Sequence, residues 1–270
     1  MIAMRPLIIL APILLSATPR LAAQEAIDSV FVEVYHVQPA ERPGDPATVT
    51  YRIFVDLAEG HELQMVYGDQ AHKLRIWTTT AFENDTVLGA KFGHQIQAGR
   101  LNEGALALDS YLTIGAADNE HMGVPRAWDK DGSVLTCPPY PGSRSRTGDA
   151  GGILAPLCIT DGLIPYEEIR EVVDFRFASG YLHKARGFDI ETTDGAYAVL
   201  GGKRGVTDRN VLLIAQLTTT GELSYMLNLQ IETPEHEPLK YVARDPGPGE
   251  FTHPSLTYGK FRATAPAMGQ

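Results

Sequence analysis

Apolar and polar residues alternate through much of the chain, and this pattern predicts β-strands. The clearest stretch is 211–232, VLLIAQLTTTGELSYMLNLQIE. In its second half, one face carries the apolar residues Leu223, Tyr225, Leu227, Leu229 and Ile231, and a period of two is typical of a half-buried strand. The first half is apolar on both faces at its start, which predicts a strand covered on both sides. We interpret 211–232 as a central antiparallel hairpin, with Gly221 supplying the positive φ of its loop.

Similar alternation predicts further strands. In 48–57, TVTYRIFVDL, the apolar face alternates with a polar face that holds Thr50, Arg52 and Asp56, and the pattern is again that of a half-buried strand. Core strands are predicted near Val30, Val49, Leu63, Leu74, Leu106, Ala196, Val211 and Leu223. Many short strands separated by glycine and proline indicate an all-β fold, most simply an antiparallel two-layer β-sandwich of jelly-roll or immunoglobulin-like kind. A barrel is the alternative.

The first 23 residues predict an export signal. A short basic start with Arg5 precedes an apolar core at 6–17, and small residues at 21–23 offer a cleavage point. The apolar core is too short to span a bilayer comfortably, and no later apolar run is long enough for a membrane helix. We therefore expect an exported chain, extracellular or periplasmic, that begins at Gln24 and has no membrane span.

The remainder predicts one domain, 24–243, because no Ser/Gly linker or charge run divides it. A polar, Gly/Pro-rich stretch at 115–165 is expected to be a long irregular loop, and loops of that length are often functional. After it, 165–177 predicts a short helix that gives way to a strand at VDFRF. The Pro/Gly-rich segment 244–270 is expected to be a partly disordered tail.

Two cysteines and the charge add to this picture. Cys137 and Cys158 both lie in the 115–165 loop, and in an exported chain they predict a disulfide worth about 3 kcal/mol. The alternative is two free thiols or a catalytic one. The net charge of −10 disfavours a nucleic-acid partner, because phosphate backbones repel an acidic chain. It fits solubility outside the cell or the binding of a cation.

Several segments of the chain resemble a family of secreted, β-rich bacterial proteins from Bacteroidetes-like organisms. They are VTYRIFVDLAEGHELQMVYG (49–68), HKLRIWTTTAFEND (72–85), LDSYLTIGAA (108–117), MGVPRAWDKDG (122–132) and VLLIAQLTTTGELSYMLNLQI (211–231). The resemblance follows the order of the chain and covers most of it. It implies a secreted β-protein and brings no activity with it.

The best candidate for a metal site is the turn WDKDGS (128–133). Asp129 and Asp131 are expected on one side of a tight turn, which suits a hard cation such as calcium. Asp118 and Glu120 in the same loop are candidates to complete a shell of oxygens. The full EF-hand pattern is absent, and the alternative is an ordinary Asp/Gly turn in which aspartate bonds its own backbone.

Two tryptophans are candidates for ligand binding. Trp128 stands beside the two aspartates, and Trp77 shares the wetter face of its predicted strand with Arg75. Such a ring can stack on a sugar, or it can be covered by a second sheet. Both readings remain open for Trp77.

Motifs for catalysis are lacking. The chain has no Gly-x-Ser-x-Gly elbow, phosphate loop or dinucleotide fingerprint, and its eight histidines are dispersed. The first hypothesis is therefore an exported, non-catalytic module that binds a polysaccharide or another cell-surface ligand through the 115–165 loop. The second is a structural envelope protein that self-associates by pairing strand edges. The third is a glycan hydrolase that uses a carboxylate pair drawn from candidates such as Asp56, Glu62, Asp109 and Glu232.

Overall fold

The computed structural model describes residues 26–259 except 41, 136–156, 158 and 177–186. Within these ranges the regular elements are β-strands and short 3-10 turns, with no α-helix. The strands form three larger sheets and one two-stranded sheet, mostly by antiparallel pairing. The predicted all-β fold is confirmed, and the arrangement is consistent with a β-sandwich.

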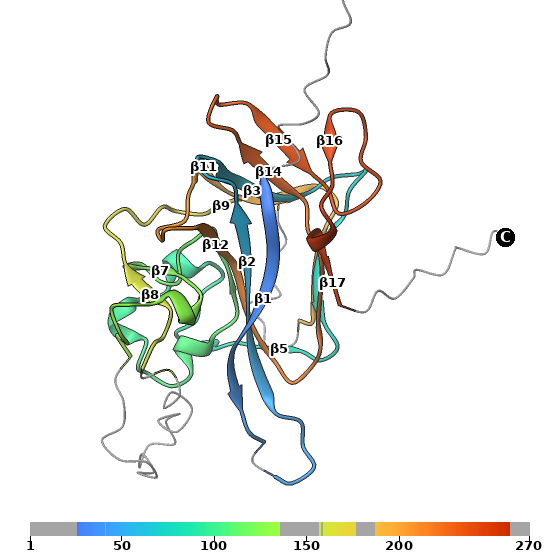
Figure 1. Ribbon diagram of the computed structural model, residues 1–270. Coiled ribbons are helices and arrows are strands. Elements are labelled where there is room, and N and C mark those ends of the chain that lie inside the picture. Colours follow the sequence, from blue (N-terminus) through green and yellow to red (C-terminus); the bar gives the residue numbers. More distant parts are fainter. Residues whose placement is uncertain (1–25, 41, 136–156, 158, 177–186, 260–270) are drawn as a thin grey trace, which may run out of the picture.

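Sheet A runs through the middle of the molecule in the order β1-β2-β12-β5, with β6 also paired to β12 (Figure 1). Its strands are β1 (Ile27–Gln38), β2 (Thr48–Leu57), β12 (Asn210–Thr219), β5 (Phe82–Glu83) and β6 (Tyr111–Leu112). The β2 and β12 strands pair along almost their whole length. The strand predicted at 48–57 is therefore confirmed to the residue.

Two further sheets lie against one face of sheet A. Sheet B has the order β16 (Glu250–Phe251), β15 (Pro238–Tyr241), β14 (Leu229–Glu232), β3 (Glu62–Gly68), β11 (Gly195–Lys203), β9 (Val173–Phe175). Sheet C has the order β10 (Asp189–Thr192), β4 (Leu74–Thr78), β13 (Leu223–Met226), β17 (Thr257–Tyr258). Apolar side chains from all three sheets form one continuous core.

The other face of sheet A is covered by the irregular part of the chain, which Figure 1 shows in green beside β1, β2 and β12. It contains a two-stranded sheet of β7 (His121–Gly123) and β8 (Leu163–Pro165). It also contains the 3-10 turns Gly93–Gln95, Ala98–Arg100, Leu106–Leu108 and Arg126–Trp128. A second core joins this region to sheet A, with Phe54 from β2 and Leu213 from β12 packed against Leu106 and Leu163.

Burial on both faces overturns the prediction of a solvated polar face on β2. Thr50, Arg52 and Asp56 are all about 1% exposed. Arg52 is satisfied without an ion pair in the described part of the chain: its Nε donates to the Gln216 side chain at 2.8 Å, and its guanidinium lies 3.4 Å from the centre of the Tyr35 ring. Polar residues alternate here because a polar network, rather than water, covers that face.

The predicted hairpin at 211–232 is wrong. β12 pairs with β2, β5 and β6 in sheet A, whereas β13 pairs with β4 and β17 in sheet C. The chain therefore crosses from one layer of the sandwich to the other between Thr219 and Leu223. Gly221 does not have a positive φ; it is needed because a Cβ there would come within 2.6 Å of Thr79 and Thr80.

A second change of sheet splits the predicted strand at 223–232. β13 ends at Met226, and β14 starts at Leu229 in sheet B. Asn228 holds this corner, because its Nδ2 donates to the carbonyl oxygens of Tyr67 and His72 and its Oδ1 accepts from Ala243 N–H. Tyr67 and His72 belong to the matching corner between β3 and β4, so one side chain fastens both crossings.

Three other expectations differ from the structure. The core strand predicted near Leu106 is a 3-10 turn, Leu106–Leu108, followed by the two-residue β6. The segment 165–177 contains no helix in its described residues, although its predicted strand is confirmed as β9. Residues 244–259, expected to be a tail, carry β16, the 3-10 turn Pro254–Leu256 and β17, and so belong to sheets B and C.

Two further predictions concern the disulfide and the membrane span. Cys137 and Cys158 lie outside the described residues. A search of the described residues finds no helix that is both long enough and apolar enough to cross a membrane.

Candidate functional site

Two cavities lie on either side of the loop that leads into β12, residues 204–210. The first, of about 500 Å³, is lined by Ala127, Trp128, Lys130, Asp131, Ile164, Val206, Thr207, Asp208 and Arg209. The second, of about 410 Å³, is lined by Asp28, Asp56, Leu57, Glu59, Gly60, Arg204, Gly205, Thr207, Asp208, Arg209 and Asn210. We call them the Trp128 cavity and the Asp56 cavity. They adjoin, because Thr207, Asp208 and Arg209 line both.

Local hydrogen bonds hold the 204–210 loop in place. The Asn210 Nδ2 donates to the carbonyl oxygens of Ala58 and His61, and its Oδ1 accepts from Gly205 N–H at 2.8 Å. The Thr207 hydroxyl donates to the Arg209 carbonyl and accepts from Arg209 N–H, which forms a small turn closed by one side chain. The wall between the two cavities is therefore defined by the loop's own sequence.

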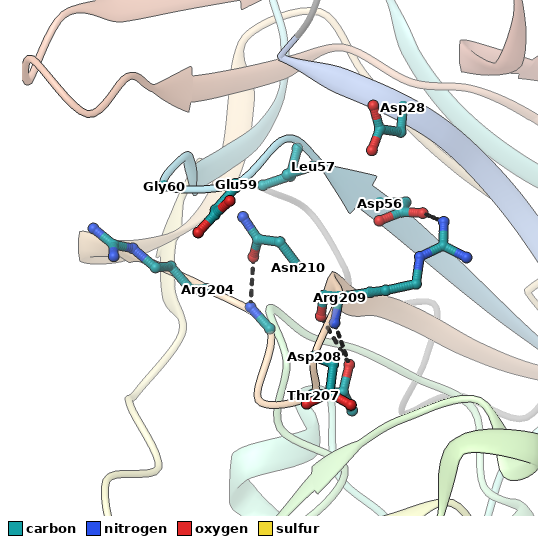
Figure 2. A pocket seen from close by; sticks show the side chains of 11 residues that line it. Asp28, Asp56, Leu57, Glu59, Gly60, Arg204, Thr207, Asp208, Arg209 and Asn210 are labelled. Atoms are coloured by element: carbon teal, nitrogen blue, oxygen red, sulfur yellow. Dashed lines mark hydrogen bonds and ion pairs between the residues drawn. The ribbon is translucent and has the colours of Figure 1, made fainter.

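Arg209 links the two cavities. Its guanidinium forms an ion pair with Asp56 on β2, as Figure 2 shows, and its Cζ lies 5.0 Å from the centre of the Trp128 ring. The Asp56 side chain is 2% exposed and that of Arg209 is 57% exposed, so the pair joins a buried carboxylate to a solvated cation. Burial raises the pKa of Asp56, and the charge of Arg209 opposes that rise. Arg209 thereby compensates a charge that β2 buries.

Trp128 ends a short 3-10 turn, Arg126–Trp128, and packs in part against the second core. Arg126 anchors this turn to β1 of sheet A and to the segment before β8. Its backbone N–H donates to the Glu33 carboxylate at 2.9 Å, and its side chain donates to the carbonyl oxygens of Tyr35 and Thr160. The turn that carries Trp128 is therefore anchored on both sides by hydrogen bonds.

Aspartates surround the turn that follows. The Asp129 carboxylate accepts hydrogen bonds from the backbone N–H groups of Asp131, Asp161 and Gly162. Asp161 in turn accepts from Ser133 and the backbone of the next two residues, so the 129–135 turn is locked to the turn before β8. Burial, with the adjacent Asp129 carboxylate, raises the pKa of Asp131 to about 6. Of these acids, Asp131 lines the Trp128 cavity.

These contacts bear on the predicted calcium ligands. The Asp118 carboxylate is engaged by the His121 ring at 2.8 Å and by the backbone N–H groups of Glu120 and His121, while Glu120 is exposed. Nowhere in the described ranges do three or more His, Cys, Asp or Glu side chains form a group able to hold a metal ion. Calcium binding by Asp118, Glu120, Asp129 and Asp131 therefore stays a prediction that these contacts do not support.

Arg75 and Trp77 lie together on β4, as predicted, and both are half-buried. The Arg75 guanidinium stacks over Trp77, with its Cζ 4.6 Å from the ring centre, and its Nε donates to Asp189 at 3.0 Å. Neither residue is among those that line the two cavities. Each tryptophan ring has an arginine over one face, but Trp128 lines a cavity and Trp77 lines neither, so Trp128 is the better candidate for a ligand.

The 204–210 loop is the part of the site that the sequence did not indicate. The available signal was a short segment with three charges, RGVTDRN, placed directly before a strand that is apolar on both faces. From the sequence, Asp56 was recognised only as one of several acids near strand ends. In the structure it lies opposite Val211 in the register of β2 and β12, which places it next to this loop.

Comparisons with protein-family models, with curated proteins and with solved structures found no match. The resemblance to secreted Bacteroidetes-like proteins accordingly stays a prediction, and the argument for function rests on the site.

Proposed function

We propose that this protein is an exported, non-catalytic binding module for a glycan or another extracellular ligand, and that the Trp128 cavity receives a sugar. The observation that carries the proposal is the Trp128 ring in the lining of a cavity of about 500 Å³. That volume lies within the range of small-molecule sites, roughly 300–1,000 Å³.

The composition of the cavity supports a sugar as ligand. Sugars present apolar C–H faces and hydroxyl rims, so they suit a site that combines an aromatic ring with planar charged groups. Here Ala127, Ile164 and Val206 supply further apolar surface, and the charged side chains of Lys130, Asp131, Asp208 and Arg209 supply donors and acceptors. The anchored turn and loop reduce the entropy lost on binding.

The test is retention of the purified protein on a panel of immobilised polysaccharides, with and without chelator. Trp128→Ala is expected to abolish retention that the wild-type protein shows. Trp77→Ala is the matched control, because it removes the same ring from a second half-buried tryptophan that also stacks with an arginine. Retention lost in Trp77→Ala and kept in Trp128→Ala would move the site to sheet C and overturn the proposal. Chelator sensitivity would support a role for calcium despite the arrangement of the carboxylates.

A glycan hydrolase is the second candidate, favoured by four carboxylates around the Asp56 cavity, those of Asp28, Asp56, Glu59 and Asp208. Burial raises the pKa of Asp56, as a general acid requires. The Arg209 ion pair opposes that use, since it stabilises the charged form. Product analysis after incubation with any retained polysaccharide decides between the two: cleavage that Asp56→Asn abolishes would favour the hydrolase.

A self-associating envelope protein is the third. β1 is an edge strand of 12 residues, with Val34 and Val37 about half exposed. Part of this edge is capped, because Val30 N–H donates to Ser255 and Tyr35 O accepts from Arg126. The uncapped part remains a candidate for strand addition.

A further inference from the structure

We infer that the Asp56 cavity is a second subsite that binds a primary ammonium group, so that the glycan of this protein bears amines. The inference rests on the proposed function, because the sugar that carries the ammonium is held by the adjoining Trp128 cavity. It is carried by the charges around the Asp56 cavity, by its size and by its continuity with the first site.

The charges of the cavity do not cancel. Asp56 is neutralised by Arg209, and Arg204 forms an ion pair with Glu62 at 2.8 Å. Asp28 and Glu59 line the same hollow, and no cation in the described part of the chain forms an ion pair with either. Figure 2 shows Asp28 and Asp56 on one side and Glu59 on the other, above the loop that bears Asp208. The hollow therefore attracts a cation.

The form of the hollow favours an organic cation over a metal ion. No group of three or more acidic, histidine or cysteine side chains in the described ranges is arranged to hold a metal ion, so the carboxylates are too dispersed to converge on a single ion. A cavity of about 410 Å³ with carboxylates at its rim instead suits an ammonium carried on a larger body. Asn210 and Thr207 add neutral hydrogen-bonding groups to the lining.

Continuity with the Trp128 cavity makes the two hollows parts of one site. Thr207, Asp208 and Arg209 form the wall between them, and the Arg209 side chain is more than half exposed along it. A linear oligosaccharide that places one ring in the Trp128 cavity can extend across this wall into the Asp56 cavity. The same charges would repel the carboxylates or sulfates of an acidic polysaccharide.

The test compares two probes of equal length and linkage, a glucosamine oligomer and an N-acetylglucosamine oligomer. Calorimetry with the purified protein is expected to give tighter binding of the glucosamine oligomer, by about tenfold at low salt, and this preference is expected to shrink as salt is added. The double variant Asp28→Asn/Glu59→Gln is expected to lose the preference and to bind the acetylated oligomer as before. Asp45→Asn/Glu235→Gln removes two exposed carboxylates elsewhere and is expected to keep the preference.

The outcomes separate this inference from the proposed function. Equal binding of the two probes by the wild-type protein, or a preference that survives Asp28→Asn/Glu59→Gln, would overturn the ammonium subsite and leave a glycan site at Trp128 standing. If neither oligomer binds, the glycan proposal fails, and a titration with glucosamine followed by amide NMR decides the subsite alone. Shifts at Gly205 and Asn210 would support it, and their absence would overturn it.

Discussion

Alanine variants of Asn228 and Asn210 can show how burial changes the contribution of similar hydrogen bonds to the free energy of unfolding. Each side chain donates to two carbonyl oxygens, at 2.9 and 3.0 Å for Asn228 and at 2.7 and 3.0 Å for Asn210. Each also accepts one backbone N–H, at 3.0 and 2.8 Å. Asn228 is 1% exposed, whereas Asn210 is half-buried beside the Asp56 cavity. Replacing either residue with alanine therefore removes three side-chain hydrogen bonds of the same kind.

The expected costs differ because water can reach only one of the two sites. In Asn228→Ala, three backbone groups lose their hydrogen bond to this side chain, two of these bonds being fully buried, and at about 1 kcal/mol for each the free energy of unfolding falls by about 3 kcal/mol. In Asn210→Ala, water can take over the same groups, so the expected loss is about 1 kcal/mol. Asn210→Ala also releases the 204–210 loop, and we expect it to weaken ligand binding more than it weakens the fold.

Urea unfolding followed by tryptophan fluorescence measures both costs by linear extrapolation, and an unchanged slope shows that each variant unfolds from the same native state. A loss for Asn210→Ala as large as that for Asn228→Ala would refute the reasoning, because burial would then not decide the cost. A loss below about 1 kcal/mol for Asn228→Ala would show that the two sheet corners do not depend on this side chain.

Three further predictions follow from charge and exposure. The hydrogen bond with Asp118 raises the pKa of His121. The stability that this bond provides is therefore fully present below the unfolded-state pKa of about 6.5 and is lost as the pH rises through the higher folded-state pKa. The midpoint of urea unfolding should fall over this pH range in the wild-type protein, and Asp118→Asn should remove this dependence. Trp128 fluorescence, measured in a Trp77→Phe background, should titrate near pH 6 with the pKa of Asp131, and Asp131→Asn should abolish the transition; a transition that persists would assign it to another group. Val34→Lys on the edge of β1 should remove any self-association that light scattering detects at high concentration, whereas a wild-type protein that stays monomeric would exclude the self-assembly hypothesis.

Local alternation predicted where strands lie but not which strands pair. The bounds of β2 match the prediction because the ten residues alternate with one exception, Phe54, which packs into the second core. The partner of β12 was missed because two adjacent strands in sequence usually pair, and here the chain changes layer instead. One signal was present: Met226, the single apolar residue on the polar face of the predicted strand, is the last residue of β13.

Part of the candidate site followed from residue type and part did not. Trp128 was singled out because it stands in the long loop beside Asp129 and Asp131, and it lines a cavity. The three charges of 204–210 mark the loop, but the role of Arg209 could not be predicted from them, because it depends on Asp56, which lies 153 residues earlier in the chain. The calcium shell was predicted from acids that are close in sequence. The alternative, a turn in which aspartate bonds its own backbone, describes the bond from Asp131 N–H to Asp129, whereas the bonds from Asp161 and Gly162 depend on the fold.

The central position of β12 constrains when this protein can fold. β2, β5 and β6 all pair with a strand that leaves the ribosome after them, and the bond between Arg52 and Gln216 joins residues 164 positions apart. Until residue 219 is made, the apolar side chains on both faces of β2 lack their neighbour, so neither core can close. Pairings this distant in sequence slow folding and expose strand edges while they wait. We therefore expect the protein to fold late in its synthesis or after it, and the unfolded chain to be prone to aggregation until β12 is in place.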